Sequence, residues 1–410
     1  MKTIIRNNVR GEEKDKCCVY RGIKYATVGE RFATPVQEDS HETVTDALSF
    51  PPMMPQSEQK KGSFYQKEFH WFEEKQPETE EDSLALNMWV PKGEGPFPVV
   101  IYIHGGAFCH GSAEEVEFDG EAWAERGIIL VTMQYRLGLL GFIALDGEKC
   151  NLGLRDQAVA CNWVYDNIEA FGGDREKISL MGQSAGGISI YCLLSSPYLV
   201  HRPFTTVMLS AGGIGGHLDI LSMNREKIEK LTREFLEERN ISKTDLSDMT
   251  LPAVIALEGE IMEYIKKRDS SVSLPFSPLI DGDFLPYTLE EAVNAGLYDG
   301  FSVLEGAVSM DLTPAPFDID KNEMLKAEGR FLERRKGRSY QYFFSHPLPP
   351  DGTPAFHSAD LWYVFRTLPR SWRGFEKEDY EIADSLMDSM ADLFRTGEMK
   401  WDEYPSVKVY

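Results

Sequence analysis

The clearest pattern in this chain is a set of apolar runs. Residues 99–103 and 128–133 form two continuous runs of mainly β-branched and aliphatic residues. Runs of this kind are typical of central strands in a sheet that is covered on both faces. Three further runs, at 178–181, 204–209 and 302–306, predict additional strands. We therefore expect a buried sheet whose strands are spread along much of the chain.

Segments with helical periodicity lie between these runs. Residues 154–171 place Val164 and Ile168 on one helical face, and residues 121–125 and 379–394 show similar patterns. Strands that alternate with helices indicate the α/β class, with a central, mostly parallel sheet and helices on both faces. No repeat or low-complexity linker divides the sequence. We therefore expect a single domain over residues 1–410.

One charged stretch does not fit this alternation. Residues 218–268 are rich in charge and helical in pattern, most clearly at 225–238. A segment of this composition is expected outside the sheet, where it either has a purely structural role or also shapes substrate entry. We interpret residues 218–270, approximately, as a reduced helical cap.

Charge and cysteine content narrow the range of partners and compartments. The formal net charge is -23, and its dense patch at 114–117 is interpreted as solvated surface. This acidity argues against nucleic acids and anionic membranes as partners. No apolar run reaches 18 residues, so no membrane span is predicted. The six cysteines lack the spacing of a disulfide or zinc framework, and the chain starts without an apolar signal segment, so we expect a cytoplasmic protein. Both a monomer and a dimer fit the sequence.

The most informative motif is Gly182-Gln183-Ser184-Ala185-Gly186. It follows an apolar strand pattern at 177–181 and precedes a helical pattern at 187–194. A G-x-S-x-G sequence between strand and helix is the nucleophile elbow, a tight turn that presents a serine hydroxyl at the end of a sheet. Its glycines allow strand and helix to approach closely. Ser184 is therefore the predicted nucleophile.

A second turn is placed where an oxyanion hole is needed. The sequence His-Gly-Gly-Ala-Phe at 104–108 directly follows the strand predicted at 99–103. In hydrolases with an elbow, backbone amides of such a turn and of the residue after the nucleophile stabilise the oxyanion. The candidate donors are the amides of Gly106, Ala107 and Ala185.

The general base should be a histidine well after Ser184, and four qualify, namely His201, His217, His346 and His357. His357 is favoured because it follows a loop and precedes a packed apolar segment, a place that presents an imidazole to a site. His346 remains an alternative at a strand end, while His201 and His217 read as surface or loop residues.

The carboxylate that orients the base is expected just after the strand predicted at 302–306. Asp311 lies in the loop beyond that strand and is favoured. Glu305 is the alternative, although its position within the strand can direct it away from the site. Four residues next to these motifs are candidate pocket walls, with core packing as the competing interpretation: Phe108, Cys109, Phe356 and Trp362.

Several motifs in a fixed order resemble the type-B carboxylesterase family of the α/β-hydrolase superfamily, which includes para-nitrobenzyl esterase-like enzymes and cholinesterases. The motifs are YRGIKYA at 20–26, RFATP at 31–35, EDSLALN at 81–87, HGGAF at 104–108, YRLG at 135–138, FGGD at 171–174, the elbow, and HSADLWYVF at 357–365. The resemblance spans nearly the whole chain. It implies the α/β-hydrolase fold, with Ser184, Asp311 and His357 as a triad and no metal or organic cofactor.

The same resemblance implies a structural salt bridge between Arg136 and Asp174. Four positions depart from the family pattern: Ser83 replaces a disulfide cysteine, Gln183 replaces a common glutamate, Asp311 replaces the usual glutamate of the triad, and Ala211 replaces a serine that many members carry near the site. The chain is also short for the family, mainly between Asp311 and His357 and after His357. We therefore expect a shallower and more open pocket.

The sequence thus predicts a serine carboxylesterase that acts through an acyl-enzyme, on short-to-medium acyl esters of small molecules. An acetyl or feruloyl esterase that acts on plant-derived esters is the alternative within the same chemistry. A non-catalytic interaction protein on the same fold is the alternative from another class. The retained serine and histidine favour an enzyme over that last alternative.

Overall fold

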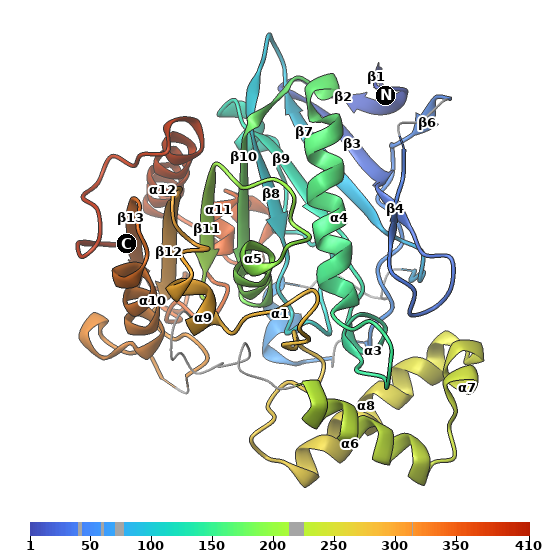
Figure 1. The fold of residues 1–410 in the computed structure, drawn as a ribbon. Helices are drawn as coiled ribbons and strands as arrows, with labels where there is room; N and C mark the ends of the chain where they lie inside the picture. The colour runs from blue at the N-terminus through green and yellow to red at the C-terminus, as the bar shows by residue number, and fades with distance from the viewer. Residues whose placement is uncertain (40–42, 59–60, 70–77, 213–224, 314) are drawn as a thin grey trace.

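A single large sheet forms the centre of the molecule in the computed structural model, which describes residues 1–410 apart from 40–42, 59–60, 70–77, 213–224 and 314 (Figure 1). Among these residues the strand order is β1-β2-β3-β7-β9-β8-β10-β11-β12-β13-β14, with β6 beside β2. The strands of this sheet are β1 Thr3–Arg6, β2 Val9–Glu13, β3 Cys17–Lys24, β6 Thr45–Asp46, β7 Ala85–Pro91, β8 Phe97–Ile103, β9 Ile129–Met133, β10 Gly173–Gln183, β11 Thr205–Leu209, β12 Ser302–Val308, β13 Ser339–Phe344 and β14 Val407–Val409. A separate pair consists of β4 Ala26–Thr27 and β5 Val36–Gln37.

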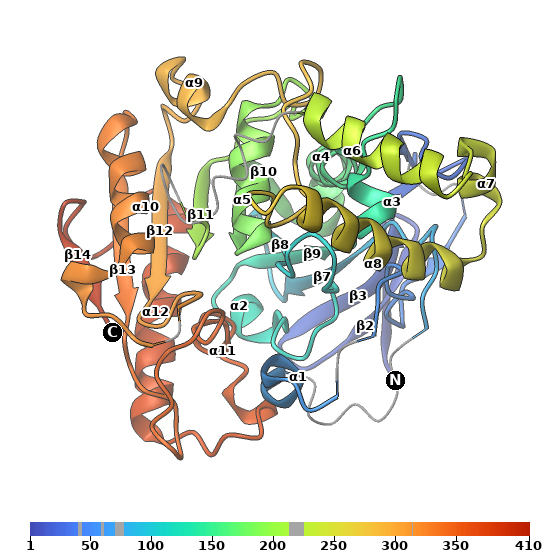
Figure 2. The same ribbon diagram turned by 90° about the horizontal axis from the view of Figure 1, so that it is seen from below.

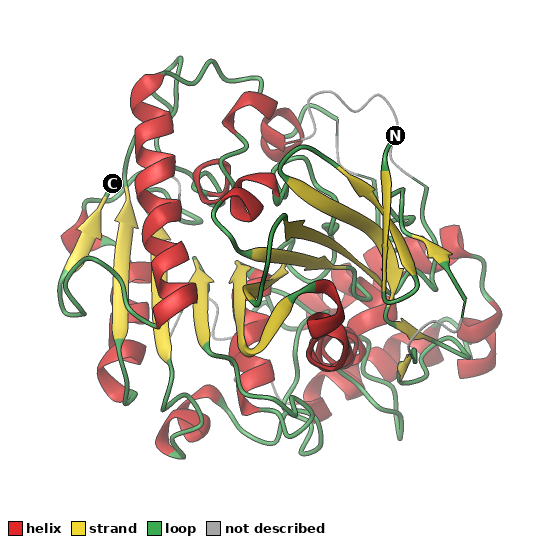
Figure 3. Cartoon of the chain, turned by 90° about the horizontal axis from the view of Figure 1, so that it is seen from above, coloured by secondary structure: helices red, strands yellow, loops and turns green. Residues whose placement is uncertain are grey.

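The sheet has an antiparallel and a parallel part. Strands β1, β2, β3, β7 and β9 pair antiparallel along the order given, whereas every pairing from β9 to β14 is parallel. Five of the parallel strands, β8 to β12, contain the apolar runs that the sequence predicts, whereas β13 and β14 were not predicted. Figure 3 shows the twist of the sheet between helical layers, with the two termini at opposite ends. The predicted α/β class with a mostly parallel, doubly covered sheet is confirmed.

Helices pack on both faces and fill two separate cores. Helices α4, α5 and α10 contribute to one core, and α2, α11 and α12 contribute to the other. The helices are α1 Phe64–Phe69, α2 Glu121–Glu125, α3 Gly138–Phe142, α4 Leu152–Asn167, α5 Ala185–Ser195, α6 Arg225–Glu238, α7 Lys243–Asp248, α8 Leu251–Arg268, α9 Leu289–Asn294, α10 Glu323–Arg334, α11 Leu361–Val364 and α12 Lys377–Thr396. Short 3₁₀ turns occur at Ile168–Phe171, Ile319–Lys321 and Leu368–Arg370. Within the described ranges, none of these helices is long and apolar enough to cross a membrane.

Strand β10 begins earlier than its apolar pattern indicates. The prediction covers 178–181, whereas the strand runs over Gly173–Gln183 with a shift in register between Gly173 and Ile178. Residues 174–177 are charged and partly exposed, so they carry no apolar signal. The carboxyl end of the strand, which leads to Ser184, is where the apolar pattern places it.

Helices α6, α7 and α8 lie outside the sheet, below it in Figure 1 and side by side in Figure 2. The boundaries of α6 are those of the predicted helix at 225–238, while residues 218–224 of the predicted cap lie outside the described residues. Helix α8 is attached to the main body through Glu258, whose Oε2 accepts a hydrogen bond of 2.7 Å from the Leu139 amide. A Cβ at Gly138 would lie 1.9 Å from that oxygen, so only glycine allows this approach.

Candidate active site

The turn after β10 has the backbone of a strained elbow. Ser184 has φ 54° and ψ −123°, a conformation that non-glycine residues rarely adopt. A Cβ at Gly182 would lie 2.5 Å from the Gly186 backbone, and a Cβ at Gly186 would lie 1.9 Å from the Ile103 carbonyl oxygen. The two glycines are therefore required for the close contact between β10, α5 and β8. Ser184 is partly exposed within this buried turn, which leaves its side chain accessible from the cavity.

The Gly-rich turn after β8 lies directly against the elbow. A Cβ at Gly105 would be 3.2 Å from the Ser184 Cβ, and Gly106, Ala107 and Phe108 all have positive φ. Among the described residues, the amides of Gly106, Ala107 and Ala185 donate to no acceptor. Ala185 is the first residue of α5, where amides have no partner within the helix. The structure thus brings the three predicted oxyanion donors to one place with their N–H groups unused.

His357 and Asp311 meet although they come from separate segments. The Nδ1 of His357 and the Oδ1 of Asp311 are 2.5 Å apart, and both side chains are buried. Asp311 lies three residues after β12, and His357 lies in the loop before α11. Because a carboxylate only accepts hydrogen bonds, the imidazole Nδ1 carries the proton of this contact. This arrangement fixes the ring so that Nε2 is the nitrogen with a lone pair.

The other ring nitrogen contacts the residue before the nucleophile. The side-chain nitrogen of Gln183 lies 3.2 Å from Nε2 of His357 in a buried contact. Over the described part of the chain, no hydrogen bond joins Ser184 to His357. Catalytic hydrogen bonds of unliganded hydrolases often form only when substrate is bound. Asp311 and Gln183 therefore contact the two ring nitrogens of His357.

The alternative candidates lie elsewhere. Glu305 is buried inside β12 and accepts a hydrogen bond of 2.6 Å from the hydroxyl of Tyr191 on α5. His346 lies 3.0 Å from Asp379 of α12. The ring of His201 stacks on Tyr165. His217 lies outside the described residues. Of the candidate bases among the described residues, His357 is thus the one that lines the same cavity as Ser184.

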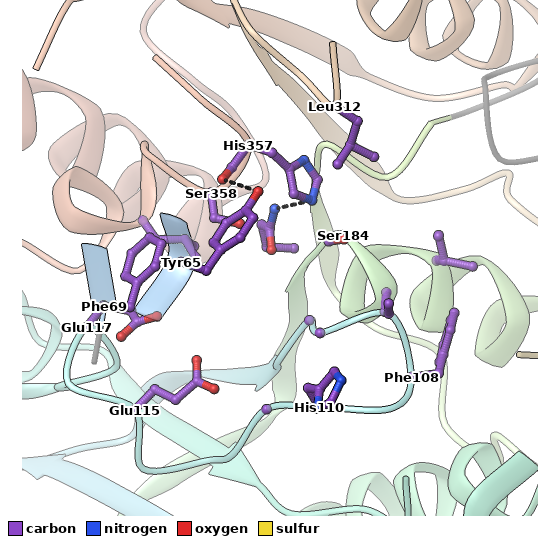
Figure 4. A pocket seen from close by; sticks show the side chains of 18 of the residues that line it. Tyr65, Phe69, Phe108, His110, Glu115, Glu117, Ser184, Leu312, His357 and Ser358 are labelled. Carbon is purple, nitrogen blue, oxygen red and sulfur yellow. Dashed lines mark hydrogen bonds between the residues drawn. The ribbon is translucent and has the colours of Figure 1, made fainter. Parts of the chain in front are cut away.

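A cavity of about 390 Å³ opens over Ser184 and His357. Figure 4 shows Tyr65, His357 and Ser358 on one side and His110, Glu115 and Glu117 on the other. The lining residues are Tyr65, Phe69, Gly105, Gly106, Ala107, Phe108, His110, Gly111, Glu115, Glu117, Phe118, Gln183, Ser184, Ala185, Ile188, Leu274, Leu312, His357, Ser358 and Leu361. The cavity size is within the range of small-molecule sites.

Of the four predicted wall residues, Phe108 lines the cavity. Cys109 lies in the core, and Phe356 and Trp362 lie behind the aromatic side chains of α1. Trp362 stacks on Phe69 with ring centroids 5.4 Å apart. This part of the wall is therefore formed by Tyr65 and Phe69 of α1, which no sequence motif marked.

Two groups of wall residues were missed in the sequence. Tyr65 and Phe69 stand four positions apart on α1, a spacing that places both on one helical face. The Tyr65 hydroxyl donates to the His357 carbonyl oxygen at 3.3 Å, and burial raises the pKa of this tyrosine to about 12. Glu115 and Glu117 belong to the acidic patch interpreted as solvated surface, and that interpretation was wrong because both residues line the cavity.

The predicted salt bridge between Arg136 and Asp174 is also wrong. The Arg136 guanidinium pairs with Asp156 of α4 through contacts of 2.7 and 2.8 Å, and both side chains are buried. Asp174 instead accepts a hydrogen bond from the Glu176 amide. Arg136 and Asp156 are twenty positions apart, and Asp156 is inside a helix whose apolar pattern gave no sign of a buried acid. Arg136 remains a structural residue, with a different partner.

The described residues hold no cluster of three or more histidine, cysteine, aspartate or glutamate side chains suited to a metal ion. The six cysteines are all buried and unpaired. Burial raises the pKa of the Cys109 thiol, the one nearest the cavity turn, so it is a poor nucleophile.

Comparison with known proteins gives a consistent result. The chain matches the Carboxylesterase family over residues 4–333. It is 31% identical over 338 residues to a para-nitrobenzyl esterase of Bacillus subtilis (strain 168), covering 79% of this chain and 66% of that protein. It is 33% identical over 238 residues to a fumonisin B1 esterase of Sphingopyxis macrogoltabida, covering 56% of this chain and 42% of that protein. The chain therefore spans less than two thirds of the length of these relatives.

A third relative is matched along most of its length. This is a bile salt-activated lipase of Bos taurus, 32% identical over 488 residues, covering 95% of this chain and 78% of that protein. Among solved structures, a thermophilic para-nitrobenzyl esterase superposes with a TM-score of 0.81 at 24% identity, covering 98% of this chain and 94% of that chain. The superposition shows the fold. From its family match and these relatives, the chain belongs to the carboxylesterase family and has the α/β-hydrolase fold.

Proposed function

We propose that this chain hydrolyses carboxylic esters through an acyl-enzyme on Ser184, with His357 as general base and Asp311 as the group that orients it. The observation that carries the proposal is the 2.5 Å contact between His357 and Asp311 beside the cavity that Ser184 lines. A serine on an elbow, an imidazole and a buried carboxylate are the groups that acyl transfer requires. Membership of the carboxylesterase family supports the same activity.

Each group has a defined task in the proposed reaction. Ser184 Oγ attacks the ester carbonyl carbon while His357 Nε2 accepts the hydroxyl proton, and Asp311 stabilises the imidazolium that forms. The three unused backbone amides donate to the oxyanion of the tetrahedral intermediate, a contribution of about 3 kcal/mol for each donor. His357 then protonates the departing alcohol, and a water molecule repeats the sequence on the acyl-enzyme.

The cavity supports small-molecule esters with short-to-medium acyl groups as substrates. Its volume is about 390 Å³, and apolar side chains such as Phe69, Phe108, Phe118, Ile188 and Leu274 dominate its wall. Apolar walls bind acyl chains through the burial of hydrocarbon surface. Two relatives are named a para-nitrobenzyl esterase and a bile salt-activated lipase, which supports ester hydrolysis as the reaction.

The proposal is tested with para-nitrophenyl esters from acetate to laurate, for the wild type and Ser184→Ala. We expect hydrolysis by the wild type that falls at least about a thousandfold in the variant, with the rate highest for short-to-medium acyl chains. Ser385→Ala, at an exposed position of α12, is the matched control and should keep full activity. Equal rates for Ser184→Ala and the wild type would contradict the serine mechanism.

A fluorophosphonate probe separates an enzyme from a binding protein on the same fold. The wild type and Ser385→Ala should react with the probe at one site, and Ser184→Ala should not. A folded wild-type protein that neither reacts nor hydrolyses any ester of the series would instead be a non-catalytic member of the family.

A further inference from the structure

The two hydrogen bonds of the His357 ring determine which ring nitrogen carries the proton. Nδ1 is 2.5 Å from a carboxylate oxygen of Asp311, so Nδ1 carries the proton. A neutral imidazole then has only a lone pair at Nε2. The Gln183 side-chain nitrogen at 3.2 Å is therefore the donor, and Nε2 is the acceptor. The atom that must take the serine proton is thus already occupied by an amide.

The position of Gln183 makes this contact specific. Gln183 is the last residue of β10, and the next residue begins the elbow. Its side-chain oxygen lies by Gly105, since a Cβ at Gly105 would be 2.9 Å from that oxygen. The Ser184 amide is held by the Leu209 carbonyl at 2.8 Å. The side chain of Gln183 therefore lies between the oxyanion turn and the base.

From this geometry we propose that Gln183 is a positioning residue for the general base, one that holds neutral His357 before reaction and reorients when the ring becomes protonated. The inference rests on the proposed esterase function. When Nε2 accepts the proton of Ser184, it becomes a donor and faces the amide donor of Gln183. A half-turn of the amide presents its oxygen instead, so a glutamine side chain serves both protonation states.

A carboxylate at position 183 could form a hydrogen bond with only the protonated state of the His357 ring. Glutamate accepts from a protonated imidazole and offers no donor to a neutral one. With Asp311 on the other nitrogen, a second carboxylate would hold the ring in its charged form, in which it cannot act as a base. Gln183 thus keeps the lone pair of Nε2 available at lower pH than a glutamate would.

Other titratable groups face the same region. The Tyr65 hydroxyl of α1 binds the His357 carbonyl, and Glu115 and Glu117 lie across the cavity. Asp360, at the start of α11, is buried and accepts from the Tyr342 hydroxyl, and burial raises its pKa to about 6. These groups are identical in all Gln183 variants, so a difference between variants reports on the Gln183 contact.

The test compares the pH profile of kcat/KM for the wild type, Gln183→Glu and Gln183→Met. Gln183→Glu should move the acid limb of the profile to higher pH by about one unit or more, with rates that converge at alkaline pH. Gln183→Met keeps the side-chain length without a donor. It should move the acid limb upward by about half a unit. KM should change little in either variant, because the contact is to the base.

Gln37→Glu is the charge control. It adds the same single negative charge at a side chain that pairs with Asp166 at an exposed position, and it should leave the profile in place. Folded Gln183 variants with the wild-type profile would overturn the inference, as would an equal shift in Gln37→Glu. If Gln183→Glu does not fold, the pH profile of Gln183→Met tests the inference.

A measurement on the unaltered protein covers the case in which neither variant folds. In a uniformly ¹⁵N-labelled sample, the coupling across the N–H···N hydrogen bond between Gln183 and His357 should be detected above the acid limb and lost below it. Absence of the coupling at both pH values would overturn the inference. Failure of the proposed function itself is distinguishable, because Ser184→Ala would then keep its activity.

Discussion

Strand β12 and the loop after it carry two buried carboxylates with different surroundings. Asp311, beyond the end of the strand, contacts the imidazole of His357 at 2.5 Å. Glu305, inside the strand, accepts a hydrogen bond from the hydroxyl of Tyr191 on α5, near Glu328. Burial raises the pKa of both glutamates well above the ordinary range. A carboxylate inside the strand is therefore part of the core, whereas one just beyond the end of the strand can reach the histidine.

The largest effect should come from Asp311→Asn. The asparagine amide donates where the carboxylate accepts, so the His357 ring loses the tautomer that leaves Nε2 as acceptor. We expect kcat on para-nitrophenyl butyrate to fall by about 10³- to 10⁴-fold with a nearly unchanged KM. Thermal unfolding of the variant controls for folding. A loss of less than tenfold in a folded protein would remove Asp311 from its proposed role.

Glu258→Gln extends the comparison to a carboxylate on the cap helix α8. Burial raises the pKa of Glu258 to about 7, whereas an unfolded chain releases this proton near pH 4.5. Because the folded state retains the proton longer, the stability that Glu258 contributes is complete below about pH 4.5. It is lost as the pH rises to about 7, on the order of 3 kcal/mol in total. Glutamine still accepts the Leu139 hydrogen bond and does not titrate.

The wild type and Glu258→Gln should therefore melt at similar temperatures near pH 5. At pH 8 the variant should melt a few degrees higher. Thermal unfolding followed at both pH values checks this expectation. Esterase activity serves as the control, since the site does not include this residue. A constant difference in melting temperature across the pH range would show that Glu258 does not titrate in the folded protein.

The smallest effect on activity should come from Glu305→Gln, the counterpart of Asp311→Asn. Glu305 points away from the cavity, so kcat should stay within about threefold. Its raised pKa means that the folded state keeps a proton that the unfolded chain releases above about pH 4.5. The wild type should thus lose more stability than the variant as the pH rises above about 4.5. A loss of activity comparable to that of Asp311→Asn would reverse the assignment of the two acids.

The parts of the site that sequence could predict are those fixed by backbone geometry. The elbow at Ser184 and the turn at Gly105 and Gly106 need glycines where a Cβ would collide, so their positions are visible as motifs. The preference for Asp311 over Glu305 followed from the same reasoning about strand ends. The structure places Asp311 beside His357 as expected.

The other features of the site depend on tertiary packing, which no local sequence pattern indicates. Glu115 looks like surface because it lies in a run of acids, and only the fold turns it toward the cavity. Arg136, which follows β9, forms its salt bridge with Asp156 of α4. The spacing of these residues in the sequence does not indicate this contact. The contact of Gln183 with His357 joins residues that are 174 positions apart.

The separation of the site residues along the chain has a consequence for biogenesis. His357 lies 174 positions from Gln183 and 46 from Asp311, and strands β11, β12 and β13 intervene between the elbow and the base. A nascent chain that has already formed the elbow still lacks its imidazole, and contacts of this sequence separation form late in folding. Regain of esterase turnover after dilution from denaturant would then mark the final step of refolding, later than the return of secondary structure seen by circular dichroism.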